Sequence, residues 1–191
     1  MARTRRRVLA ASGLLLAGLG GCSSVDESAT ASPTATERGY AETVEEPVSR
    51  TVRGPSSEFV VRSTLANPIS GWADSHWLIR DRDDREALYF ADDAEGVDAA
   101  RSLIEATDFS SALVLVNQHP VSACRTWVLE RLHWGAGDAD APPGSAAVEL
   151  DYERERRSGD CEEDPPGDVA ATFVRVPARF ERTTSFGVRV S

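Results

Sequence analysis

The sequence contains no lysine: all 21 of its basic residues are arginines, and they stand against 31 aspartates and glutamates. Lysine is normally among the commonest residues of a globular protein, so its absence is a compositional signal. The formal net charge of −10 argues against nucleic acid and anionic membrane surfaces as partners, because an acidic surface repels both. The hydrophobic content of 41% is ordinary, so a folded core is expected.

Metal-binding and nucleophilic side chains are also scarce. The three histidines, His76, His119 and His133, are scattered without His-x₃-His or Cys-x₂-Cys spacing, so we predict no metal site and no cofactor. Met1 is the only methionine, which argues against a blue-copper cluster of cysteine, histidine and methionine. The sequence has no Gly-x-Ser-x-Gly nucleophile motif, so it does not favour an enzyme, although it does not decide the question.

Some side chains leave binding functions open. Three acidic groups are typical of solvated turns, with calcium binding as the alternative, and none matches an EF-hand loop: Asp81/Asp83/Asp84, Asp92/Asp93/Glu95 and Glu162/Glu163/Asp164. The pair Asp151 and Glu153 is expected on one face of a strand, but such pairs arise by chance in an acidic chain. Core packing is expected of the tryptophans, with a groove for a sugar or peptide as the alternative: Trp72, Trp77, Trp127 and Trp134.

Residues 1–21 have the pattern of an export signal. The first nine residues contain four arginines and no acid, and a weakly apolar run extends from Val8 to Gly21. This run is shorter than the ~20 residues of a membrane-spanning helix, so a cleaved signal is favoured over a transmembrane segment. Arg5 and Arg6 lie in a sequence that resembles the twin-arginine consensus, which directs folded proteins to export.

The apolar run ends in Leu19-Gly20-Gly21-Cys22, which resembles a lipobox. Enzymes that process lipoprotein precursors require small residues before a cysteine, and the lipidated cysteine becomes the new N-terminus. We therefore predict that Cys22 carries a lipid that holds the protein on the outer face of the cell membrane. The alternative is an ordinary cleaved signal with an incidental cysteine.

Removal of residues 1–21 leaves 17 arginines and the same 31 acids, a net charge of −14. This acid-rich, lysine-free composition resembles that of extremely halophilic archaea, in which high salt screens the repulsion between carboxylates. A GC-rich genome also depletes lysine, but it does not explain the excess of acid. Residues 22–56 are rich in Ser, Thr, Ala, Pro and Glu without apolar periodicity, so we predict a disordered linker before a domain over residues 57–191.

The first part of the predicted domain mixes short strands with one helix. Strands are expected over 59–61, 76–80 and 87–90, and the charged stretch 81–86 between the last two is typical of a hairpin turn. A helix is expected next. Asp92 and Glu95 fit a capping box at its start. Its apolar face recurs at helical spacing: Val97, Ala100, Leu103 and Ile104.

The second part is predicted to be all β. A buried strand is expected over 112–116, a hairpin over 125–134 and 146–156, and two further strands over 169–176 and 186–190. In the second hairpin strand, Val148, Leu150 and Tyr152 alternate with acids, which predicts one buried and one wet face. With eight strands and one helix, the expected fold is mainly β (α+β): an antiparallel β-sandwich or open barrel with one helix.

The hairpin over 125–156 also suggests a disulfide. If Arg125 lies opposite Glu155, Cys124 is at the open end of the hairpin, and Cys161 follows Arg156 by five residues. An exported protein tolerates disulfides, so we predict a bridge between Cys124 and Cys161. Two free thiols are the alternative.

A series of segments in fixed order provides a resemblance. The segments are 77–88, Thr107-Asp108-Phe109-Ser110 before 113–116, Cys124, Leu132-His133-Trp134-Gly135, 150–156, Gly159-Asp160-Cys161 and 171–178. They resemble a family of uncharacterised haloarchaeal lipoproteins over about residues 77–190. The shared segments mark positions of the fold, and the resemblance supplies no catalytic residue.

We expect a lipid-anchored extracellular surface protein with a binding or structural role. Its expected partners are the membrane, through the lipid on Cys22, and a surface protein or polymer. The alternative is a hydrolase or metal-dependent enzyme that acts on cell-surface polymers. A partly buried carboxylate or histidine pair in a cleft would favour that alternative, whereas a disulfide-closed sandwich without a cleft would favour the binding or structural role.

Overall fold

The computed structural model describes residues 40–55, 59–64, 75–137, 139–157 and 167–191. All of them belong to one compact unit over residues 38–191. Within the described residues there are two helices, α1 (Arg82–Glu86) and α2 (Val97–Glu105). The ten strands described are β1 (Glu42–Glu45), β2 (Ser49–Pro55), β3 (Val61–Ser63), β4 (Ser75–Ile79), β5 (Leu88–Phe90), β6 (Leu113–Val121), β7 (Arg125–Ala136), β8 (Ser145–Arg156), β9 (Asp168–Val176) and β10 (Arg182–Val190).

The strands form two four-stranded sheets and one small sheet. The first sheet has the order β1-β7-β8-β10, the second has the order β2-β9-β6-β4, and β3 pairs with β5 alone. Every pair is antiparallel except β8 with β10, which is parallel. The predicted mainly β sandwich is therefore confirmed, with two more strands and one more helix than expected, and neither sheet closes into a barrel.

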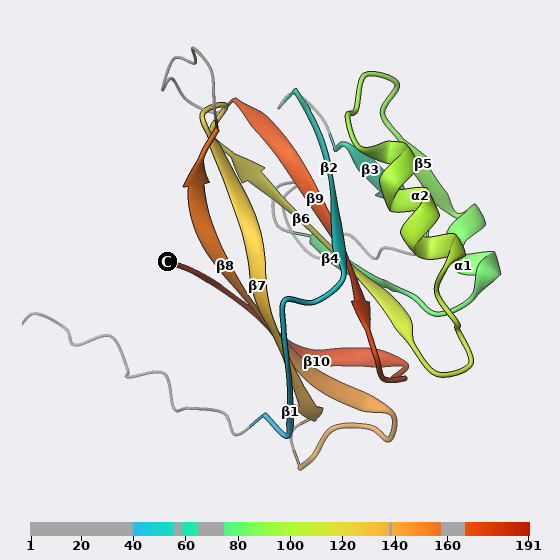
Figure 1. Ribbon diagram of the computed structural model, residues 1–191. Helices are drawn as coiled ribbons and strands as arrows, with labels where there is room; N and C mark the ends of the chain where they lie inside the picture. Colours follow the sequence, from blue (N-terminus) through green and yellow to red (C-terminus); the bar gives the residue numbers. More distant parts are fainter. Residues whose placement is uncertain (1–39, 56–58, 65–74, 138, 158–166) are drawn as a thin grey trace, which may run out of the picture. The chain divides into compact units, whose positions relative to one another are not determined.

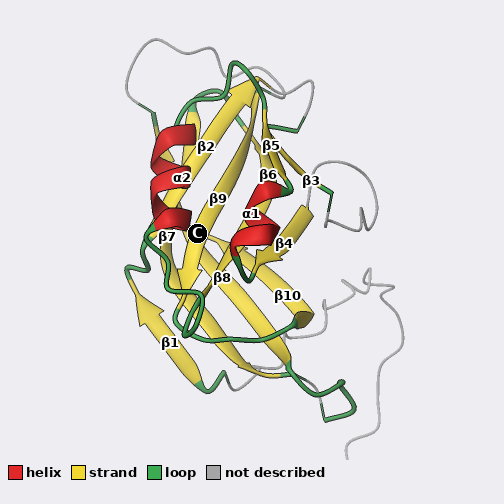
Figure 2. Ribbon diagram, turned by 90° about the vertical axis from the view of Figure 1, so that its right-hand side faces the viewer, coloured by secondary structure: helices red, strands yellow, loops and turns green. Residues whose placement is uncertain are grey.

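The second sheet is the middle layer of the unit. In Figure 1, β7 and β8 lie on one side of β2, β9 and β6, and the helices with β3 and β5 lie on the other. Figure 2 shows both helices over the strands of this middle sheet. Because both of its faces are covered, nearly every residue of β6 and β9 is buried. The sequence of a strand that is covered on both faces is a continuous apolar run, as it is over residues 112–116.

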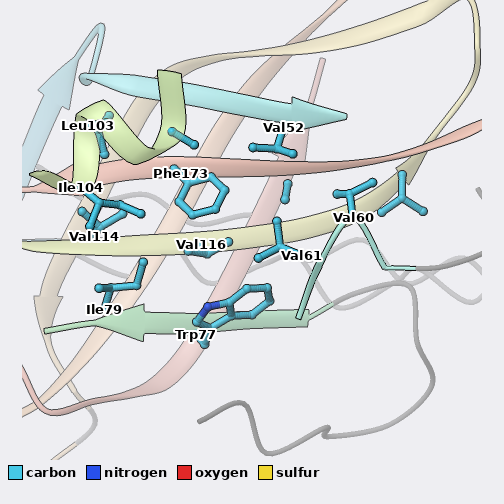
Figure 3. Close-up of a cluster of buried hydrophobic side chains, with 13 residues drawn as sticks. Val52, Val60, Val61, Trp77, Ile79, Leu103, Ile104, Val114, Val116 and Phe173 are labelled. Carbon is cyan, nitrogen blue, oxygen red and sulfur yellow. The ribbon is translucent and has the colours of Figure 1, made fainter. Parts of the chain in front are cut away.

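The layer between the middle sheet and the helices is filled by apolar side chains (Figure 3). Phe173 of β9 lies at its centre and is completely buried. Val114 and Val116 of β6 and Ile104 of α2 pack around it. The predicted helical face is confirmed, since Ala100, Leu103 and Ile104 are buried and Val97 packs against the same cluster.

The layer between the two large sheets is apolar at one end. Leu113 and Leu115 of β6 and Val174 of β9 meet Val148 and Leu150 of β8 there. The predicted alternation along β8 is confirmed, because Val148, Leu150 and Tyr152 are each at most 1% exposed.

The β7–β8 hairpin is confirmed with a register that differs by one residue. Arg125 lies opposite Arg156, and Thr126 lies opposite Glu155. A register irregularity between Leu129 and Arg131 adds a residue to β7. The register is set at the loop, where Ala136 lies opposite Ala146, and local sequence patterns place the ends of a loop only to within a few residues.

The predicted disordered linker over 22–56 is wrong for its C-terminal part. Residues 42–45 pair with β7, and residues 49–55 pair with β9 along their whole length. Val52 of β2 is completely buried in the layer beneath α2. The small and polar side chains around it resemble a linker, but the segment is held by pairing with strands more than 80 positions away, which local composition does not reveal. The domain therefore begins before residue 57.

The predicted hairpin over 76–90 is also wrong. β4 pairs with β6, β5 pairs with β3, and residues 82–86 form α1 instead of a turn. Asp81 caps this helix, since its carboxylate accepts a hydrogen bond from Asp84 N at 2.8 Å. Asp84 is buried and accepts from Arg80 N at 2.7 Å. Of the acids predicted to be solvated, Asp81 and Asp83 are exposed, whereas Asp84 is buried at the start of α1.

The start of α2 differs from the predicted capping box. Its N-cap is Gly96, with no side-chain hydrogen bond, and Glu95 makes backbone hydrogen bonds with Arg53 instead. Gly96 has a φ of 85°, and a Cβ there would lie 2.3 Å from Thr51 O, so glycine is required at this close approach. Among the described residues, no helix has the length and apolar character needed to cross a membrane.

Candidate functional site

Several predicted site residues lie outside the described residues: Arg5, Arg6, Cys22 and Cys161, together with Trp72 and the acidic group 162–164. Cys124 is described and is completely buried in the turn between β6 and β7. Its thiol is not free. Arg157 N donates to Cys124 O at 2.9 Å, so the chain passes this turn four residues before Cys161. The bridge to Cys161 stays a prediction that this approach supports.

The buried side chain of Arg53 makes hydrogen bonds to the same turn between β6 and β7. Arg53 Nε donates to Asp168 Oδ2 at 2.5 Å. Its two terminal nitrogens donate to Arg125 O and Ser122 O, each at 2.7 Å. A buried guanidinium is tolerated where its hydrogens are used in this way. Arg53 thereby ties β2 to the start of β9 and to the β6–β7 turn.

A pocket of about 360 Å³ opens where the edge strands of the two large sheets, β4 and β10, approach each other. Its lining comes from both sheets: Ser75, His76, Asn117, His119, Trp127, Phe186, Val188 and Val190. In a chain that is 27% charged, no aspartate, glutamate or arginine is found among the described residues of this lining. The volume and the apolar walls with a few polar groups are those of a small-molecule site.

The inner wall of the pocket is a buried polar cluster. The His119 ring stacks on Trp127 with centroids 4.0 Å apart. Asn117 Nδ2 lies 3.3 Å from both His119 Nδ1 and Tyr152 Oη. Because an amide nitrogen only donates, His119 Nδ1 accepts, and the proton of the neutral ring is on Nε2. Among the described residues, nothing accepts a hydrogen bond from this buried Nε2.

The electrostatics of this wall favour neutral groups. Burial, with a smaller contribution from the charge of Arg53, lowers the pKa of His119 to about 4. Burial raises the pKa of the Tyr152 phenol. Both side chains are therefore uncharged at neutral pH.

The outer wall carries a second histidine. The His76 ring stacks on Phe186 with centroids 4.1 Å apart, and its Nε2 lies 2.9 Å from Thr183 Oγ1. Burial lowers the pKa of His76. The structure thus brings His76 and His119 to one pocket although 42 positions separate them in the sequence.

His133 lies elsewhere, on the outer face of the first sheet. Its Nε2 lies 3.1 Å from Asp151 Oδ2, and its Nδ1 lies 2.8 Å from Thr43 Oγ1. Hydroxyl, imidazole and carboxylate therefore stand in a row across three strands. Arg131 Nε adds an ion pair to Asp151 Oδ2 at 3.4 Å. None of these three side chains lines the pocket between β4 and β10.

The remaining predicted candidates have structural positions. Trp77 is buried beneath the helices, and Trp134 packs between the large sheets, so only Trp127 of the described tryptophans lines the pocket. Across the described part of the chain, no three His, Cys, Asp or Glu side chains are placed to hold a metal ion.

Sequence reasoning missed the inner wall because residues 117–119 resemble the end of a strand. The available signal is period-two alternation: Leu113 and Leu115 predict that Asn117 and His119 face the same layer if the strand continues. Comparisons with known proteins add nothing to the site, since no protein family, no curated protein and no solved structure matches the chain.

Proposed function

We propose that this protein is lipid-anchored at the outer face of the cell membrane and that its sandwich domain binds a small organic ligand between the two large sheets. The anchor rests on the signal pattern of residues 1–21 and on the lipobox before Cys22. The binding role rests on the pocket between β4 and β10.

One observation carries the binding role: the pocket joins apolar walls to buried polar atoms that lack partners. Phe186, Val188 and Val190 offer an apolar wall, whereas His119 Nε2 is unpartnered among the described residues. An unpaired buried donor costs free energy, and a ligand acceptor that reaches it after a small side-chain shift removes that cost. The absence of charged side chains from the lining favours an uncharged ring or alkyl group, because a charge buried there would have no counter-ion.

The binding role is tested with phenylacetamide as a neutral ring probe. NMR titration should shift the indole signal of Trp127 and the ring signals of His76 and His119 at millimolar probe. Val188→Phe should weaken binding at least fivefold by filling the rim, because Val188 is 39% exposed at the pocket. Val128→Phe is the matched control, since Val128 is 41% exposed on β7 outside the pocket. Absence of any shift in the wild type would reject the binding role.

The anchor is tested by mass spectrometry of the native protein. The expected N-terminus is Cys22 with added lipid mass, and Cys22→Ser should release the protein to the medium. Replacing Arg5 and Arg6 by lysine should leave precursor in the cytoplasm if export uses the twin-arginine route, because lysine lacks the planar guanidinium. A native protein that retains residues 1–21 would contradict the anchor.

A hydrolase is the second candidate. His76 and His119 line one pocket, and a histidine pair in a cleft is the feature expected of such an enzyme. It ranks lower because the pocket lining contains no carboxylate to orient either ring, and Ser75 is its single hydroxyl. Turnover of p-nitrophenyl acetate that is lost in His76→Gln would establish this candidate. Loss in Thr43→Val instead would place the activity at the outer row of Thr43, His133 and Asp151.

A further inference from the structure

The C-terminal half of strand β8 carries basic side chains on one face and acidic side chains on the other. Asp151, Glu153 and Glu155 alternate with Tyr152, Arg154 and Arg156. Since Tyr152 points into the layer between the sheets, Arg154 and Arg156 continue its face beyond the core, and the acids occupy the opposite face. A chain with excess acid thus presents a basic surface at one end of this layer.

This basic surface lines a groove beside the pocket. The groove has a volume of about 440 Å³ and is lined by Pro120, Val121, Ser122, Arg125, Trp127 and Arg154. Its described lining contains two arginines and no acid, although acids outnumber arginines 31 to 21 in the whole chain. Trp127 belongs to the lining of both the groove and the pocket, so one molecule that passes the indole reaches both.

The arginines of the groove come from two paired strands. Trp127 of β7 lies directly opposite Arg154 of β8. Arg125 lies two residues before Trp127, on the same face of β7. Arg154 is exposed, and among the described residues no carboxylate forms an ion pair with it. A guanidinium in this position offers two parallel N–H donors, the geometry that matches a carboxylate.

We propose that the ligand is a ring-bearing carboxylic acid: its ring occupies the pocket, and its carboxylate lies in the groove against Arg154. This inference rests on the proposed binding role and adds the charge and the orientation of the ligand. The acidic surface of the whole protein repels anions at long range, but at molar salt the Debye length is only about 3 Å. The nearest charged side chains then decide the preference, and among the described residues that line the groove these are arginines.

The test compares phenylacetate with phenylacetamide, which differ only in the charged end. NMR titration of the wild-type domain at moderate salt should give a dissociation constant about fivefold lower for phenylacetate, the scale of a partly exposed charge-assisted hydrogen bond. Arg154→Gln should remove this preference while leaving phenylacetamide binding unchanged. Arg50→Gln is the matched control, because Arg50 is an exposed arginine of β2 outside the groove.

The outcomes separate this inference from the proposed function. Binding of phenylacetamide without a preference for phenylacetate overturns the inference and leaves the binding role intact. Binding of neither probe overturns both.

Discussion

The two faces of the middle sheet are built by the same strands and serve different purposes. Toward the helices, β6 and β9 present Val114, Val116 and Phe173. The buried polar residue on this face, Gln118, is hydrogen-bonded: its Oε1 accepts from Val61 N at 3.0 Å. Toward the first sheet, the same strands change from apolar to polar along their length. There His119 Nε2 has no hydrogen-bond partner among the described residues. A buried polar side chain that is hydrogen-bonded stabilises the fold. A buried polar atom without a hydrogen-bond partner beside a pocket is instead a candidate contact for a ligand.

The largest effect is expected in the closed layer. Phe173→Ala removes a completely buried ring that lies 5.9 Å from Phe90, and it should lower the free energy of unfolding by about 4 kcal/mol. Urea denaturation measures this loss. A loss below about 1 kcal/mol would mean that the layer beneath the helices is loosely packed, and the contrast between the faces would fail.

At the polar end of the layer between the two large sheets, the stability of the domain should depend on covalent cross-links more than on apolar packing. Reduction of the predicted Cys124–Cys161 bridge should lower the free energy of unfolding by about 4 kcal/mol, the scale expected for a loop of this size. Peptide mapping without reductant should show the two cysteine peptides joined. Free thiols at both positions in native protein would contradict the bridge.

Acid should destabilise the folded domain through the buried histidines of the pocket. The unfolded chain protonates His119 near pH 6.5, whereas the folded state does so at about pH 4, so the unfolded state binds more protons between these values. Stability is therefore complete above pH 6.5 and falls by about 3 kcal/mol as the pH drops towards 4. His76, whose pKa burial also lowers, acts in the same direction.

The acid effect is measured by urea denaturation at pH 7 and pH 4.5. His119→Gln keeps a polar side chain but does not titrate, so its stability should change less between the two pH values than that of the wild type. An equal change in both proteins would assign the acid sensitivity to the carboxylates instead.

The smallest effect compares two neighbouring amides. Gln118→Leu leaves Val61 N without its acceptor in a closed layer and should cost about 2 kcal/mol. Asn117→Leu acts beside the pocket, where water replaces the lost donor, and should cost less than about 1 kcal/mol. Thermal unfolding of the two variants compares them directly, and equal losses would remove the distinction between the two faces.

Local patterns predicted the elements that local contacts hold together. The apolar spacing of Val97 to Ile104 gave α2, and the alternation along 146–156 gave β8 within one residue of its register. β1 and β2 were missed because their partners, β7 and β9, lie far away in the sequence. The pocket was missed for the same reason: His76 and His119 come together only after β4 pairs with β6.

The strand order has a consequence for the speed of folding. Among the pairings described, only β7 with β8 joins strands that follow each other directly, and every other pair encloses at least one intervening element. Hairpins form within about 10 μs, whereas pairings that close long loops place β-sandwich folding in milliseconds to seconds. We therefore expect the β7–β8 hairpin to be the folding nucleus. A substitution at Leu132 or Leu150 should slow folding, whereas one in β2, whose strand partner β9 is distant in the sequence, should mainly accelerate unfolding.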